Sequence, residues 1–81
     1  MKKHARKAFN ALKKLGCPVK ECDWEDRGHF WIDGEDPEAE GWIDYWDMNL
    51  SAGSDKLNEI LAENGLYWEW QNSAWGNVYD T

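Results

Sequence analysis

Cysteine and histidine are the residue types in this chain whose spacing could most readily indicate a chemical site. Cys17 and Cys22 are separated by four residues, and His4 and His29 could complete a set of four zinc ligands. Structural zinc sites usually combine two closely spaced ligand pairs, however, and this sequence has one. Two cysteines are also too few for the disulfide scaffold of a small secreted protein. We therefore expect two reduced thiols, no metal and no cofactor, in preference to a zinc site or a disulfide.

Carboxylates gather between Asp33 and Asp44, where a calcium loop is the chemical alternative to a solvated surface loop. An EF-hand loop needs glycine at its sixth position and a helix on each side. Counting from Asp33, that position is Glu38, and we expect strands as the flanking elements. A solvated acidic loop is the better interpretation.

No nucleophile with a recognisable base marks this chain as an enzyme. Ser51, Ser54 and Ser73 stand at expected cap or turn positions, and neither histidine has a patterned partner. With sixteen acidic residues, some pair of carboxylates will always resemble a catalytic pair. The sequence therefore predicts a protein that is not an enzyme.

Charge is distributed very unevenly along the chain. Residues 1–20 carry seven lysines and arginines and no acid, whereas residues 21–81 carry sixteen acids against Arg27 and Lys56, which gives +7 and −14. The acidic part would repel phosphates, so nucleic acid could approach only through the N-terminal segment. The cations that would make this alternative basic face are Lys3, Lys7, Lys13 and Lys14.

The location expected from the sequence is the cytoplasm. No apolar run has the length that a membrane span needs, and the basic N-terminus is not followed by the apolar stretch of a signal peptide. We accordingly expect no membrane partner.

Hydrophobic periodicity predicts a single α+β domain over residues 1–81. Apolar residues on one half of the helical wheel indicate a helix over 2–15, ended by Gly16 and Pro18. Alternating patterns predict strands at 19–26 and 29–33, and an apolar run predicts a third at 42–46. Ser54 would cap a second helix that ends at Gly65, and a hairpin would follow with its turn at Asn72 and Ser73. The expected order is α-β-β-β-α-β-β, with both helices on one face of a mostly antiparallel sheet.

The two halves of the chain also suggest an internal repeat. A shift of 46 positions superimposes Leu15 on Leu61 and Ile32 on Val78, and both halves then read helix, glycine, strand, turn, strand. The identity between the halves is low, so duplication is an open alternative.

Seven tryptophans are more than an 81-residue core readily buries. Trp24, Trp68 and Trp70 stand at inward strand positions. The other strand tryptophans lie in segments that are apolar on both faces, so some of their rings should be exposed. Exposed aromatic rings among carboxylates suit lysine and arginine through cation–π contact, and tryptophan is enriched in binding hot spots. The predicted binding residues are Trp31, Trp42, Trp46, Glu35, Asp36, Glu38 and Glu40.

Two stretches of the chain resemble small proteins encoded by tailed bacteriophages. They are the opening His4-Ala-Arg-Lys-Ala-Phe-Asn-Ala-Leu-Lys-Lys-Leu-Gly-Cys-Pro18 and the close, Asn64-Gly-Leu-Tyr-Trp-Glu-Trp with Gly76-Asn-Val-Tyr-Asp80. The resemblance implies a context and no chemistry, because such proteins are often early products that bind host factors.

The functional expectation is a non-enzymatic phage accessory protein that modulates a host or phage protein through an acidic, tryptophan-bearing surface. The partner would be a protein and could be basic, and the chain itself would be a monomer or a weak homodimer. Three alternatives remain: a DNA mimic that inhibits a nucleic-acid-binding protein, nucleic-acid binding through the basic N-terminal helix, and a carbohydrate-binding module.

Overall fold

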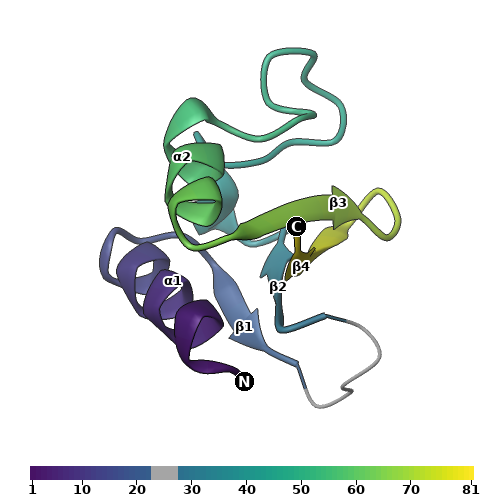
Figure 1. The fold of residues 1–81 in the computed structure, drawn as a ribbon. Helices are drawn as coiled ribbons and strands as arrows, with labels where there is room; N and C mark the ends of the chain where they lie inside the picture. The colour runs from purple at the N-terminus through teal and green to yellow at the C-terminus, as the bar shows by residue number, and fades with distance from the viewer. Residues whose placement is uncertain (23–27) are drawn as a thin grey trace.

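The computed structural model of this protein describes residues 1–22 and 28–81. Four antiparallel strands form one sheet in the order β1-β2-β4-β3, and two α-helices lie together on one side of it (Figure 1). This arrangement confirms the predicted α+β class. The elements in chain order are α1 (Lys3–Lys14), β1 (Val19–Glu21), β2 (Phe30–Asp33), the 3₁₀-helix η2 (Pro37–Ala39), α2 (Asp55–Glu63), β3 (Leu66–Trp70) and β4 (Trp75–Asp80).

Both helices were predicted correctly, because their ends carry strong local signals. The chain leaves α1 through Gly16 and leaves α2 through Gly65, whose φ angles of 92° and 71° favour glycine. At the start of α2 the hydroxyl of Ser54 accepts the Leu57 N–H at 3.2 Å. None of the helices that the structure describes is long and apolar enough to cross a membrane.

The core lies between the helices and the inner face of the sheet. Phe30, Ile32 and Val78 of the two central strands are fully buried, and the Phe9 ring of α1 meets the Phe30 ring edge-on at 5.3 Å. Because side chains alternate along a strand, Trp31 between Phe30 and Ile32 lies on the opposite, outer face. The buried residues that the helices add are Ala5, Ala8, Phe9, Leu12, Leu57 and Leu61.

The predicted third strand over residues 42–46 is wrong, since this segment forms turns. The N–H groups of Trp42 and Ile43 both donate to the Ala39 carbonyl, at 2.8 and 3.2 Å. The Asp44 carboxylate then accepts the Trp46 N–H at 3.0 Å. Short polar side chains compete in this way with a β-ladder for the backbone donors, and here they prevail over the apolar pattern.

The register of the C-terminal hairpin differs by one residue from the one that a tight turn at Asn72 and Ser73 predicts. Asn72 accepts the N–H groups of Ala74 and Trp75, which makes a wider loop, and Trp70 therefore pairs with Gly76. A slip of one residue moves every side chain to the other face. For this reason Trp75, Asn77 and Tyr79 lie on the outer face, whereas a two-residue turn at Asn72 and Ser73 would place them beside Trp68 and Trp70.

The two halves of the chain share the order α-β-β, and their second strands are neighbours at the centre of the sheet. Trp31 and Asn77, which the predicted shift of 46 superimposes, lie directly opposite each other in the β2–β4 ladder. In the first half β1 ends at Glu21, and Cys22 lies outside the strand that was predicted over 19–26. Positions 23–26 of that predicted strand, which include Trp24, fall outside the described residues.

Candidate functional site

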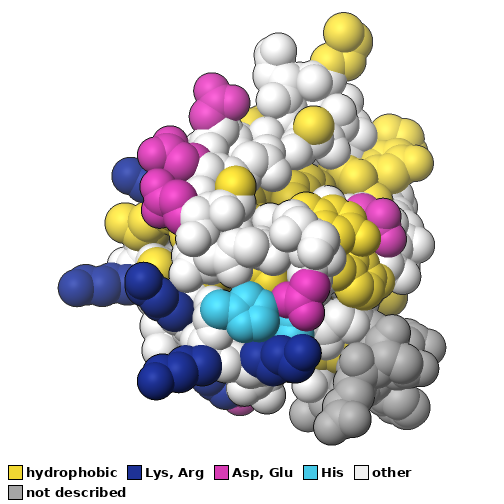
Figure 2. Space-filling model, viewed as in Figure 1, with side chains coloured by type: hydrophobic (Ala, Val, Ile, Leu, Met, Phe, Trp, Pro, Cys, Tyr) yellow, Lys and Arg dark blue, Asp and Glu magenta, His cyan; other side chains and the backbone are white. Residues whose placement is uncertain are grey.

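The most exposed apolar side chains of the described residues belong to the loop of residues 44–50, which we call the tryptophan loop. Trp46 is 81% exposed and Met48 is 93% exposed. Hydrophobic side chains project from the top of the molecule in Figure 2, where the loop leading into α2 lies in Figure 1. Large apolar groups held in water on a small domain are typical of a protein-binding surface.

Backbone hydrogen bonds hold the tryptophan loop in one shape despite its exposure. The Asp44 N–H donates to the Leu50 carbonyl at 3.2 Å and closes the loop. Within it the Asp47 carbonyl accepts the N–H groups of Leu50 and Ser51, at 3.0 and 2.7 Å, and the Asp47 carboxylate accepts the Asn49 N–H at 2.8 Å. The loop is therefore ordered before any partner arrives.

Aromatic contacts attach the tryptophan loop to the sheet. The Tyr45 ring meets the Trp46 ring at 5.0 Å and the Trp70 ring at 5.4 Å, both edge-on. The indole N–H of Trp70 donates to the Ser51 carbonyl at 2.5 Å. Trp70 in turn packs edge-on against Trp68 at 4.9 Å. A continuous series of rings thus runs from the core to the exposed Trp46.

The carboxylates predicted to join the site precede the loop in the chain. Glu35, Glu38 and Glu40 are exposed. Asp36 is half-buried because it has a structural role: its carboxylate accepts the Glu38 N–H at 2.8 Å at the start of η2 and lies 3.5 Å from the Lys20 ammonium. Three of the four predicted acids are therefore available to a partner, and the fourth is held by the fold.

Trp31 and Trp42 lie in other parts of the structure than Trp46. The Trp31 ring meets Trp75 edge-on at 6.1 Å on the outer face of the sheet. Trp42 is partly buried against the core and, with Leu15, borders a hollow beside the start of α2. Of the three predicted tryptophans, Trp46 alone is both strongly exposed and on the tryptophan loop.

The alternative basic face is present on α1, where Lys3, Lys7, Lys13 and Lys14 are exposed. The lysine and arginine ion pairs found among the described residues involve Arg6 with Glu21 and Lys20 with Asp36 instead. The cations of α1 are thus mostly solvated, as expected of a charged helix face.

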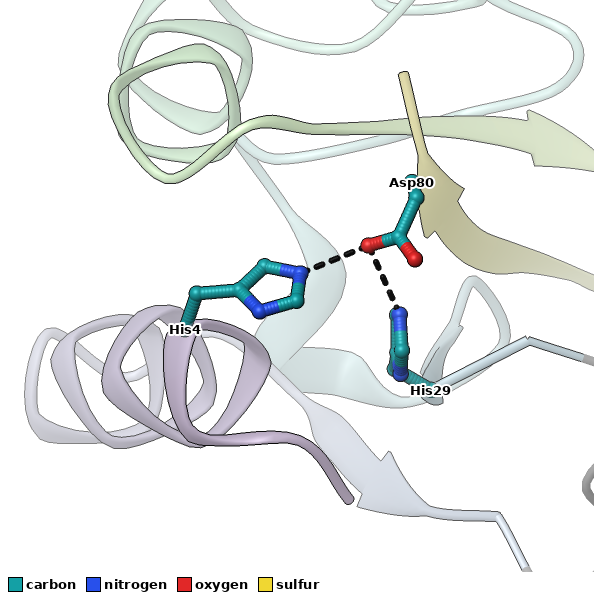
Figure 3. A group of neighbouring side chains, drawn as sticks. All are labelled: His4, His29 and Asp80. Atoms are coloured by element: carbon teal, nitrogen blue, oxygen red, sulfur yellow. Dashed lines mark hydrogen bonds and ion pairs between the residues drawn. The ribbon is translucent and has the colours of Figure 1, made fainter.

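A second group of side chains that can bind protons or metal ions comes from three distant parts of the chain. Its members are His4 of α1, His29 just before β2, and Asp80 at the end of β4. One oxygen of Asp80, Oδ1, lies 2.6 Å from His4 Nε2 and 2.9 Å from His29 Nε2 (Figure 3). The two imidazole rings meet edge-on at 5.4 Å. The hydrogen bond from His4 lowers the pKa of the Asp80 carboxyl most, and the hydrogen bond from His29 lowers it further. The Asp80 carboxyl is therefore ionised at neutral pH.

The structure does not assemble the set of two cysteines and two histidines that we considered from the sequence. Cys17 is buried in the core, and burial raises the pKa of its thiol to about 12, which disfavours the thiolate that binds metals. Asp80 stands beside the histidines instead. No spacing rule connects positions 4, 29 and 80, and this group was missed because only the sheet order brings it together.

The chain matches no protein-family model, no curated protein and no solved structure.

Proposed function

We propose that this protein acts without catalysis by binding another protein through the tryptophan loop. Trp46 and Met48 would enter an apolar pocket on the partner, and the acidic residues nearby would meet a basic rim around that pocket. The observation that carries the proposal is the exposure of Trp46 and Met48, 81% and 93%, on a loop that is already hydrogen-bonded.

The energetics favour an anchor of this kind. A tryptophan buries about 150–250 Å² in a pocket, and at about 25 cal/mol per Å² this amounts to roughly 4–6 kcal/mol of transfer free energy. Binding surfaces lose part of that gain when a flexible loop must be ordered. Here the hydrogen bonds of Asp44 and Asp47 have ordered the loop already, so less of the gain is lost.

Charge complementarity indicates a basic partner. Between Arg27 and Lys56 the sequence contains eight acidic residues and no lysine or arginine. A partner with lysine or arginine around its pocket would be attracted at long range, and acidic partners would be repelled. An exposed indole also accepts cation–π contact from such side chains.

The biological context belongs to the same proposal. The resemblance of both ends of the chain to small tailed-phage proteins supports an accessory protein that modulates a host or phage protein in the host cytoplasm. Ser54 has a structural role, since its hydroxyl caps α2, and this supports binding over catalysis.

Selection from a library of random short peptides, followed by affinity measurement on the selected peptides, tests this function. We expect selected peptides to combine lysine or arginine with an aromatic or aliphatic residue. The double variant Trp46→Ala, Met48→Ala should lose roughly thirtyfold or more in affinity, as hot-spot residues do. Trp75→Ala removes an indole that is 37% exposed on the outer sheet face and is the matched control.

The charge part of the proposal has its own pair of variants. Glu38→Gln with Glu40→Gln removes two charges from the exposed segment that precedes the loop in the chain, and Glu59→Gln with Glu63→Gln removes two from exposed positions on α2. The first pair should weaken peptide binding more than the second, and added salt should reduce the difference. Selection of acidic peptides, or equal binding by wild type and the Trp46 and Met48 double variant, would overturn the proposal.

A further inference from the structure

The His4, His29 and Asp80 group is independent of the tryptophan loop and has the composition of a metal site. One ligand atom from each residue can be chosen so that all three lie within 4.8 Å of one another. At metal–ligand bonds of about 2.0–2.2 Å, neighbouring ligands around a tetrahedral ion lie about 3.3–3.6 Å apart. The separations of 2.6 and 2.9 Å to Asp80 would therefore have to widen by roughly 0.4–1.0 Å to admit an ion.

We propose that His4 Nε2, His29 Nε2 and the Asp80 carboxylate bind a divalent transition-metal ion of the zinc type. Two imidazoles with one carboxylate form a set that suits Zn²⁺, Co²⁺ or Ni²⁺, whereas Mg²⁺ and Ca²⁺ require mainly oxygen ligands. Three protein ligands leave a further coordination position for water.

The chemistry of binding follows from the hydrogen bonds present without metal. Each Nε2 that now donates to Asp80 would direct a lone pair at the ion, and the ring would then carry its proton on Nδ1. A neutral ring reaches this state by moving its proton from Nε2 to Nδ1 through solvent, and a doubly protonated ring by releasing the Nε2 proton to solvent. The carboxylate is already ionised and needs no proton loss. Figure 3 shows both Nε2 atoms directed at the same carboxylate oxygen, so the three side chains already converge on one point.

The solvent exposure of the site and the charges around it determine how tightly it can bind a metal ion. The side chains of His4 and Asp80 are 40% and 46% exposed, so an ion can reach the site from solvent. Lysine and arginine side chains lie beside the imidazoles in Figure 2, and Lys3, Arg6 and Lys7 border a hollow together with His4. These cations oppose a second positive charge, so we expect weaker binding than in a buried structural zinc site.

The location of the site predicts a measurable consequence for folding. Its ligands come from α1, the residue before β2 and the end of β4, and the unfolded chain does not hold these segments together. A metal that binds only the folded chain stabilises it by mass action. At a hundredfold excess over the dissociation constant, Zn²⁺ should raise the melting temperature by roughly 10–20 °C.

The test uses tag-free protein titrated with ZnCl₂ and CoCl₂, followed by calorimetry, thermal melting and visible absorption. The chain contains only two histidines, so histidine ligation can be assigned without ambiguity. We expect one ion per chain, cobalt d–d bands without the thiolate charge-transfer band of cysteine ligation, and no response to MgCl₂. His4→Gln, His29→Gln and Asp80→Asn should each lower affinity at least roughly tenfold, as loss of a ligand or its support does.

Cys22→Ser is the control, because Cys22 borders the same hollow as His29 but lies outside the group of three ligands. This variant should bind metal as the wild type does. The proposal is overturned if the wild type shows no heat and no thermal shift with Zn²⁺. It is equally overturned if His4→Gln and His29→Gln bind normally, or if Cys22→Ser abolishes binding. Circular dichroism of each variant without metal verifies that it is folded.

Discussion

Trp46 and Trp68 are the same residue type in opposite surroundings. Trp68 of β3 is 9% exposed and its indole lies against Gly53 and Gly76, where any added Cβ would collide with it. Trp46 is 81% exposed, and the ring contact that the structure gives it is with Tyr45. The comparison separates a tryptophan that stabilises the fold by its burial, Trp68, from one whose apolar surface remains in contact with water, Trp46, as the proposed binding function requires.

Truncating the buried ring should have the largest effect on stability. Trp68→Ala removes a side chain that fills the space between Gly53 and Gly76, and such losses cost about 3–5 kcal/mol. Urea unfolding of this variant and of Trp75→Ala, the exposed control on the outer face, measures the difference. A loss for Trp68→Ala no greater than for Trp75→Ala would contradict its role in the core.

Adding one methyl group under the same ring should have the next largest effect. A Cβ at position 76 would lie 2.6 Å from Trp68 Cζ3, so Gly76→Ala should destabilise the protein by about 1–3 kcal/mol through overpacking. Because the clash is with the indole, the cost should shrink when Gly76→Ala is made in a Trp68→Leu background. Strict additivity of the two changes in a double-mutant cycle would show that the ring is not responsible.

Trp70 contacts both the buried Trp68 and Tyr45 of the tryptophan loop. A small change at Trp70 should therefore reduce the order of the tryptophan loop more than that of the core. Trp70→Phe keeps an aromatic ring but removes the N–H that donates to Ser51, which should cost about 0.5–1.5 kcal/mol. Amide hydrogen exchange should become faster in residues 44–50. The same exchange measured within α1 provides the control, since unchanged protection in both regions would refute the connection.

The parts of the fold that the sequence predicted correctly are those fixed by local interactions. Gly16, Ser54 and Gly65 mark helix ends through effects of a few residues, so both helices were located. Asp44 illustrates why the third strand failed, because its carboxylate satisfies a backbone donor within the turn and an apolar pattern does not reveal this.

The candidate sites could likewise be predicted from the sequence only where local features determine them. Trp46 could be proposed as exposed because seven tryptophans exceed what a small core holds, but composition did not separate it from Trp42, which packs against the core. The register of β4 followed from the hydrogen bonds of Asn72, and only that register places Asp80 on the inner face beside the edge of α1. The contact of Asp80 with His4 depends on pairing across the whole chain, which no local pattern contains.

The most direct test of the central claim measures stability and binding on the same variant, Trp46→Ala. An exposed residue contributes little to folding, so its free energy of unfolding should stay within about 0.5 kcal/mol of the wild type. Its affinity for the selected basic peptides should fall at least roughly tenfold, while Trp75→Ala binds them normally. Loss of stability with unchanged peptide affinity would contradict the account, because Trp46 would then serve the fold and not a partner.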